Sequence, residues 1–286
     1  MNRLRISLCN EVLQPLPFAR QCELAAAMGY DALEVAPFTL ADDPTGITDA
    51  QAREFARMAS DQGLAISGLH WLLVQPSGLT ITEGDAALRD RTAAWMERQV
   101  ELCAAMGGSY LVHGSPKQRR VPDGGSVQLA WDRARECFAR AGRRAQACGV
   151  TYCIEPLARR EANLLNTVEE GARMVDEIGI PALRTMIDCS AAGQAEKQPV
   201  HELMAQWMST GRIAHVQVND PNRRGPGQGD LRFDAVLRTI QAMRAQGHYN
   251  DLIAVEPFDY VPDGIGCAAR SIGYLRGVLE GIESHD

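Results

Sequence analysis

The sequence predicts an α/β protein folded as one closed (β/α)8 TIM barrel, a single domain over residues 1–286. Short β-type runs alternate eight times with longer runs whose apolar residues have helical spacing. The strand runs are almost continuously apolar, which is typical of parallel strands covered by helices. The longest connections follow strands, as in barrels whose active-site loops leave the C-terminal ends of the strands.

The expected strands are short apolar runs, each followed by one expected helix. They are residues 5–10, 32–38, 65–71, 109–115, 151–157, 184–190, 213–220 and 252–258. The first helical run, residues 17–30, has a glycine near its exit, where a helix commonly ends. The segments AAMGGS, AQACGV, DEIGIP and RAQGHY carry the same glycine stop before a strand.

An open, doubly wound sheet is the alternative architecture. That fold places a G-x-G-x-x-G motif after its first strand, whereas here the first strand ends in LCNEVLQ. No linker rich in proline, serine or glycine divides the chain. Because barrels near 250 residues routinely form one domain, the closed barrel is the simpler prediction.

The composition limits the classes of function. The chain is 45% hydrophobic and 23% charged, and its net charge of -7 disfavours nucleic acid as a partner. No apolar run has the length of a membrane span, and the N-terminal residues lack a signal-peptide pattern, so we expect a cytoplasmic protein. The eight cysteines are scattered without a C-x-x-C pair, which favours reduced thiols over a zinc site.

Four strand-like segments each carry a potential metal ligand. CIEPL, MIDCS, HVQVND and IAVEPF supply Glu155, Asp188, Gln217 and Glu256. Because parallel barrel strands end at a common mouth, we expect these side chains to converge. Three carboxylates and an amide oxygen suit a hard divalent cation, with Mn²⁺ expected first and Mg²⁺ or Co²⁺ as alternatives.

The surroundings of these ligands support the prediction. Glu155 and Glu256 each precede a proline, which holds the preceding residue extended. Gln217 shares one face of its strand with His215 and Asn219, so it either coordinates a metal or only orients a ligand. His215 lies one layer deeper, and we interpret it as a packed core histidine.

Together these segments resemble the sugar isomerase/epimerase superfamily of xylose-isomerase-like barrels, which includes ketose 3-epimerases and hydroxypyruvate isomerase. The resemblance implies a metal held by the four residues above. At the third ligand position, ketose 3-epimerases carry histidine and hydroxypyruvate isomerases carry glutamine. This chain carries glutamine there, as Gln217. It also implies that Glu161 and Arg223 contact the substrate. One departure is Ala191, which stands where the family places a substrate-binding histidine.

Further polar residues lie near the ends of the expected strands. His70 and His113 end the third and fourth strands, where each either contacts the substrate or packs in the core. Asn10 and Glu11 end the first strand and are candidates to line the cavity. The fourth loop carries three cations, for which a phosphate contact is the alternative and solvation is the expectation: Lys117, Arg119 and Arg120.

The predicted function is that of a divalent-metal-dependent isomerase or epimerase of a keto-sugar or related α-hydroxy-carbonyl compound. The resemblance implies proton transfer through a metal-stabilised enediolate, with Glu155 and Glu256 as acid/base groups on opposite faces of the sugar. A single shuttling glutamate would instead give aldose–ketose isomerisation. The alternative is a metal-dependent lyase or dehydratase acting on a keto-sugar or keto-inositol, and a nuclease or a noncatalytic sugar-binding barrel is disfavoured. The expected partners are a small-molecule sugar and further copies of the chain, in a homodimer or homotetramer, without nucleic acid or membrane.

Overall fold

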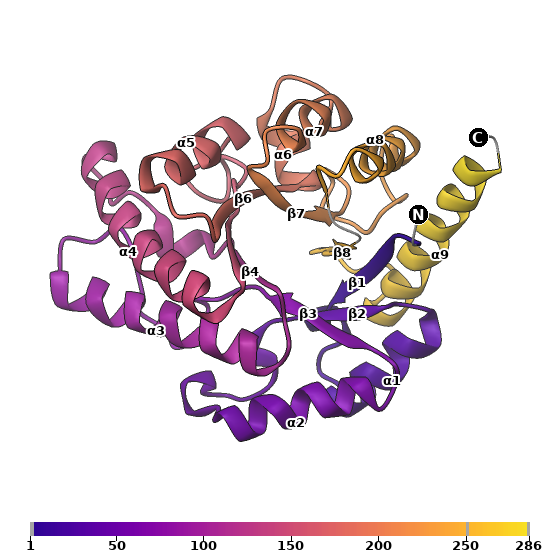
Figure 1. Cartoon of the computed structure of the whole chain (residues 1–286), viewed down its shortest axis with the longest axis horizontal. Helices are drawn as coiled ribbons and strands as arrows, with labels where there is room; N and C mark the ends of the chain where they lie inside the picture. Colours follow the sequence, from indigo (N-terminus) through magenta and orange to yellow (C-terminus); the bar gives the residue numbers. More distant parts are fainter. Residues whose placement is uncertain (1–2, 250–251, 285–286) are drawn as a thin grey trace.

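Eight parallel strands form one closed barrel in chain order (Figure 1). The computed structural model describes residues 3–249 and 252–284. The first strand pairs with both the second and the last strand, which closes the sheet and confirms the predicted (β/α)8 barrel. The strands are β1 Arg5–Cys9, β2 Ala32–Val35, β3 Ala65–Leu69, β4 Tyr110–His113, β5 Thr151–Ile154, β6 Leu183–Asp188, β7 Ile213–Val218 and β8 Leu252–Val255.

Helices surround the barrel on the outside (Figure 1). They bury their apolar faces against the nearly continuous apolar strands, so one core joins sheet and helices. Within the described residues, none is long and apolar enough to cross a membrane. The helices are α1 Phe18–Met28, α2 Asp49–Ser60, α3 Ala86–Ala105, α4 Val127–Cys148, α5 Val168–Ile178, α6 Cys189–Ala195, α7 Val200–Met208, α8 Phe233–Ala245 and α9 Gly264–Glu283.

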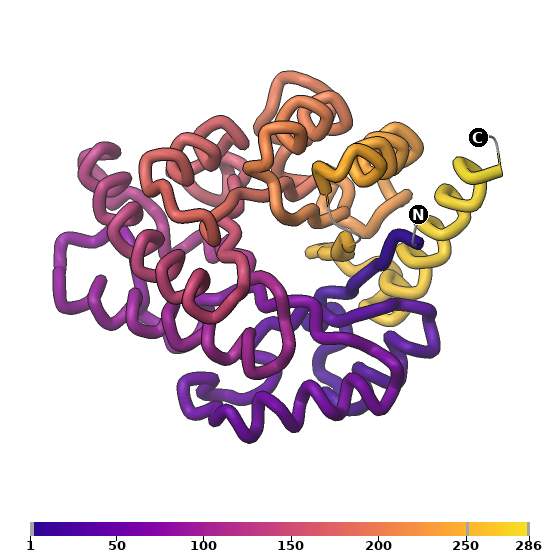
Figure 2. Tube along the Cα trace, in the orientation of Figure 1, coloured from indigo at the N-terminus to yellow at the C-terminus, as the bar shows by residue number. Residues whose placement is uncertain are grey.

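The first and last parts of the chain lie side by side, with α9 beside β1 (Figure 2). Arg276 of α9 donates to the carbonyl oxygen of Leu4 at 2.8 Å and to Asp31 at 2.6 Å. The final helix is therefore bound to the residues that lead into β1 and β2.

The glycine stops lie at left-handed backbone positions, as predicted. Gly29, Gly149 and Gly179 cap α1, α4 and α5 with φ values of 91°, 71° and 68°. Gly107 and Gly247 have φ values of 76° and 75° shortly after α3 and α8. Because a side chain is strained in this conformation, glycine ends these helices and turns the chain toward the next strand.

Two details differ from the predicted boundaries. The strands end earlier than the apolar pattern, so that Glu155 and Glu256 are the first residues beyond β5 and β8. The segment after β6 forms two helices, because Pro199 stands at the N-terminal cap of α7 and proline cannot continue a helix from within.

The cysteines are free thiols, as expected. All of them are buried except Cys148, which is half-buried.

Candidate active site

The four predicted ligands meet at the C-terminal end of the barrel. Glu155 follows β5, Asp188 ends β6, Gln217 lies in β7 and Glu256 follows β8. The strand register places Asp188 beside Gln217, on adjacent strands. Ligand oxygens of Glu155, Asp188 and Glu256 lie within 4.8 Å of one another, and each of the four side chains is at most 4% exposed.

The three carboxylates share a buried space that disfavours their charges. Burial, together with the charges of Glu256 and Asp188, raises the pKa of Glu155 well above its usual value. Burial raises the pKa of Glu256 to about 8, although its contact with His70 acts in the opposite direction. Burial likewise raises the pKa of Asp188 to about 7, against its hydrogen bonds with Ala191 and Asn219. A divalent cation among these oxygens would relieve both the repulsion and the cost of burial.

Two acceptor atoms at this place also fit a cation. Gln217 Oε1 and Glu256 Oε2 are buried and have no hydrogen-bond partner among the described residues. The amide nitrogen Nε2 of Gln217 donates to Glu34 Oε1 at 2.7 Å, which leaves the amide oxygen available as a ligand. Because an unpaired buried acceptor is costly, an oxygen-binding divalent metal fits these residues.

Asn219 fixes the orientation of Asp188. Its Nδ2 donates to Asp188 Oδ2 at 2.7 Å and to the carbonyl oxygen of Glu256 at 2.8 Å. The backbone N–H of Ala191 donates to Asp188 Oδ1 at 2.6 Å. Ala191 stands where the family carries a substrate-binding histidine, so this position contributes a backbone hydrogen bond to Asp188 here. Asn219 was not predicted as a site residue, although its place on the Gln217 face of the expected strand 213–220 was a usable signal.

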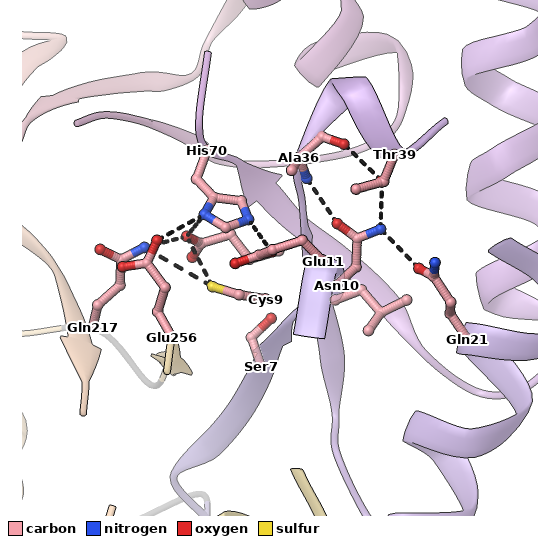
Figure 3. A network of polar contacts seen from close by, with 12 residues as sticks. Ser7, Cys9, Asn10, Glu11, Gln21, Ala36, Thr39, His70, Gln217 and Glu256 are labelled. Carbon is pink, nitrogen blue, oxygen red and sulfur yellow. Dashed lines mark hydrogen bonds and ion pairs between the residues drawn. The ribbon is translucent and has the colours of Figure 1, made fainter. Parts of the chain in front are cut away.

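A second group of metal-ligating residues overlaps the first and includes Cys9, Glu11, His70 and Glu256. Figure 3 shows the His70 ring between the two carboxylates, with Nε2 2.9 Å from Glu11 Oε2 and Nδ1 3.1 Å from Glu256 Oε1. Burial disfavours a charged ring, but the neighbouring carboxylates raise the pKa of His70 well above its usual value. A charged His70 ring would offset part of the negative charge of this group, so the Glu155, Asp188 and Glu256 group is the better candidate for a metal site.

Glu34 forms a buried polar layer below the ligands, and sequence reasoning missed it. Its Oε2 lies 2.9 Å from His215 Nε2 and accepts a hydrogen bond from Tyr110. Burial alone would raise the pKa of Glu34, but His215, His70 and Tyr110 lower it to about 2. Glu34 is therefore a carboxylate that orients Gln217. Its signal was a single charged residue within an otherwise apolar strand, ALEV.

His215 lies in this layer and not at the cavity. Its ring is fully buried and stacks on Tyr110 with 4.0 Å between ring centroids. The structure agrees with its interpretation as a core histidine.

A cavity of about 860 Å³ opens at the C-terminal end of the barrel. Both glutamates of the ligand group line it, and so do three predicted substrate contacts, His70, Glu161 and Arg223. Arg223 donates from Nη1 to Glu161 Oε1 at 2.7 Å, which joins the loops after β5 and β7.

Two other predictions, those for His113 and Asn10, have a different outcome. His113 is not among the residues that line the cavity: its Nδ1 lies 2.7 Å from the Tyr152 hydroxyl, and its ring packs edge-on against Phe138. This position favours packing and does not support a substrate contact. Asn10 bonds Gln21 and the backbone of Ala36 on the side away from His70 (Figure 3).

Arg119 corrects the expectation of a solvated fourth loop. Lys117 and Arg120 are exposed as expected, but the Arg119 side chain is 0% exposed. Next to it, Asn163 from the loop after β5 bonds both the N–H and the carbonyl oxygen of Val121, which holds the loops after β4 and β5 together.

Residues 22–277 match the family model described as the xylose isomerase-like TIM barrel. The chain belongs to this family. The match covers most of the barrel, and it confirms the resemblance found in the sequence.

Named relatives include two ketose 3-epimerases. A D-psicose 3-epimerase of Ruminiclostridium cellulolyticum is 24% identical over 267 residues, covering 91% of this chain and 84% of the relative. An L-ribulose 3-epimerase of Mesorhizobium japonicum is 25% identical over 228 residues, covering 78% and 70%. The structure of the 3-keto-D-glucoside 4-epimerase from E. coli aligns with a TM-score of 0.79 at 20% identity, covering 96% of this chain and 100% of that one, which supports the fold.

Proposed function

We propose that this protein is a divalent-metal-dependent epimerase or isomerase of a keto-sugar or related α-hydroxy-carbonyl compound. The observation that carries the proposal is the placement of two glutamates, Glu155 and Glu256, in one buried carboxylate group that faces one cavity. The relatives named as ketose 3-epimerases favour epimerisation within this class.

The ligands in this proposal are Glu155, Asp188, Gln217 and Glu256. Their donor atoms are all oxygens, which favours Mn²⁺ or Mg²⁺ over Zn²⁺, and Mn²⁺ is the expected ion. When bound, such an ion supplies Lewis-acid polarisation of the substrate carbonyl and stabilises the negative charge of an enediolate.

The two glutamates perform the proton transfers. Glu155 and Glu256 follow β5 and β8, and the strands that carry Asp188 and Gln217 lie between them, so the two carboxylates approach the substrate from different sides. One carboxylate removes the proton next to the carbonyl, and the other delivers a proton to the opposite face of the planar intermediate. His70 holds Glu256 through its 3.1 Å contact with Oε1, and the paired Glu161 and Arg223 present polar atoms to substrate hydroxyls.

Deuterium uptake tests the proposal. The Mn²⁺-loaded protein is incubated with a panel of keto-sugars in deuterated water, and the products are examined by NMR. We expect deuterium at the carbon next to the carbonyl of one sugar, together with its epimer or isomer. A product that has lost water would instead establish a lyase, and the absence of exchange with every sugar would contradict the proposal.

Gly114 gives a first prediction, since it leaves room for the Glu155 carboxylate. A Cβ added at Gly114 would lie 2.2 Å from Glu155 Oε2, so Gly114→Ala must displace that carboxylate. We expect turnover to fall about a hundred-fold, because misplacement of a catalytic group by about 1 Å costs this much. The barrel should stay folded, since the displaced atom ends a flexible side chain.

Steady-state kinetics and thermal melting measure both effects. Gly277→Ala is the matched control, because a Cβ at Gly277 meets nothing within 4 Å. Parent-like turnover in Gly114→Ala would show that the position of Glu155 does not limit the reaction.

Gln217 gives a second prediction, which separates metal coordination from simple orientation. Gln217→Leu removes the amide oxygen and should weaken Mn²⁺ binding strongly, with the barrel still folded because its lining tolerates apolar residues. Gln217→His should still bind metal but shift the preference toward zinc or cobalt, since imidazole is a softer ligand. Titration of both variants with Mn²⁺ and Zn²⁺ measures these affinities. If both bind Mn²⁺ as tightly as the parent, Gln217 only orients other groups.

A further inference from the structure

The outer wall of the cavity is rich in cationic side chains. Three loops contribute them, those after β4, β5 and β7. The cations that line the cavity are Lys117, Arg120, Arg160 and Arg223. Apart from the two catalytic glutamates, Glu161 is the one acidic residue lining the cavity in the described part of the chain. This concentration of positive charge contrasts with the net charge of -7 of the whole chain.

Most of this positive charge is not neutralised by the protein. Arg223 pairs with Glu161 at 2.7 Å. Lys117, Arg120 and Arg160 have no ion-pair partner within residues 3–249 and 252–284. Isolated surface cations are commonly solvated. Lys117, Arg120 and Arg160 differ from isolated surface cations because their side chains line one cavity. The loops that carry them are held together by the hydrogen bonds between Asn163 and Val121.

Arg119 adds a buried positive charge behind the same wall. It ends the turn Pro116–Arg119, which also carries Lys117 and immediately precedes Arg120. Its three guanidinium nitrogens have no hydrogen-bond partner in the described ranges, and its side chain is 0% exposed. The guanidinium keeps its charge in this buried position, because arginine does not deprotonate in proteins. Charges in such a low-dielectric setting act strongly on a group in the adjacent cavity.

A metal ion bound among the buried carboxylates would leave the positive charge of the outer wall unpaired. A divalent cation would offset two of the three negative charges of Glu155, Asp188 and Glu256, deep in the barrel. The outer wall would remain positive, because the cations of the β4 and β5 loops lack acidic partners among the described residues. A neutral sugar would leave this charge unused, whereas a phosphate or carboxylate would form charge-assisted hydrogen bonds with it.

We propose that the substrate carries an anionic group, a phosphate or a carboxylate, at the end of its carbon chain away from the reacting carbons. Lys117, Arg120 and Arg160 bind this group at the outer wall, while the carbonyl end lies near Glu155 and Glu256. The inference rests on the proposed function and narrows its substrate to acidic or phosphorylated keto-sugars.

Calorimetric titration tests this inference independently of turnover. The Mn²⁺-loaded protein is titrated at constant low ionic strength with three probes: a neutral ketohexose, its phosphate ester at the terminal carbon, and the sugar acid with a carboxylate at that carbon. We expect at least one anionic probe to bind at least about ten-fold tighter than the neutral sugar, as for hydrogen bonds to charged groups. The probe that binds tighter identifies phosphate or carboxylate as the natural group.

The double variant Lys117→Gln/Arg120→Gln tests whether the anionic probe binds at the outer wall or at the metal ion. Its preference for the anionic probe should fall several-fold, because Arg160 and Arg223 are the cations left to line the cavity among the described residues. Arg143→Gln, an exposed change of the same charge type on α4, should keep the parent's preference. Equal affinity of the parent for neutral and anionic probes would overturn the inference, and so would an undiminished preference in the double variant.

Deuterium uptake by the same three probes distinguishes this inference from the proposed reaction. Exchange that is equally efficient on the neutral sugar, without anion preference, would support the epimerase or isomerase and overturn the anionic substrate. Tight anion binding at the outer wall with no exchange on any probe would support the anion site and contradict the proposed reaction.

Discussion

Glu155→Gln and Glu256→Gln should each lower kcat about a thousand-fold or more while the barrel stays folded. A glutamine keeps the shape of the side chain but cannot accept or deliver the proton, and general acid/base catalysis commonly contributes this much. The fold should tolerate the change, because each substitution removes one charge from a crowded buried group. In the absence of metal we therefore expect melting temperatures equal to or above that of the parent.

Kinetics, elemental analysis and thermal melting of the two variants check this expectation. Glu136→Gln, an exposed change of the same charge type on α4, is the matched control and should retain parent turnover. Substantial turnover by Glu155→Gln or Glu256→Gln with the metal still bound would remove that residue from the acid/base role.

Asp188→Ala should abolish metal binding at this site and, with it, turnover. The substitution removes one of three anionic ligands, and the remaining donors leave a hard cation poorly neutralised. It also removes the cap of α6, because Asp188 Oδ1 accepts the backbone N–H of Ala191 at 2.6 Å. We expect the lost cap to cost about 1 kcal/mol of folding free energy.

Asp188→Asn separates the two effects. Asparagine can still cap α6 through its amide oxygen but brings no charge, so this variant should lose most metal affinity while it keeps the cap. Its remaining loss of stability should come from its amide NH2, which would face the Nδ2 donor of Asn219. Elemental analysis measures the metal content and chemical denaturation measures the stability. A metal-to-protein ratio unchanged in both variants would contradict the four-ligand assignment.

The sequence predicted the barrel because its signals are local and repeat. Each glycine that ends a helix needs a left-handed backbone, whatever lies elsewhere in the chain, so Gly29, Gly149 and Gly179 could be identified by position alone. The ends of the strands were less predictable. The apolar pattern continues to the prolines after Glu155 and Glu256, whereas strand pairing stops one residue before each glutamate.

The carboxylates proposed as ligands could be predicted to lie together because the topology brings the ends of parallel strands together. Glu34 escaped detection because its partner His215 comes from β7, and one chain alone does not show which strands share a layer. The burial of Arg119 escaped prediction because a charged residue in a loop is usually solvated, and nothing local in the sequence marks this one as buried. The sequence could not decide the role of His113, because its contact with Tyr152, which favours packing over substrate binding, is visible only in the structure.

The position of a bound metal is the most direct test of the central claim. Crystals of the protein grown with Mn²⁺ would give an anomalous diffraction peak at each manganese. We predict one such peak within coordination distance of Glu155, Asp188, Gln217 and Glu256. A peak among Cys9, Glu11 and His70 instead, or no peak near Asp188, would contradict the account.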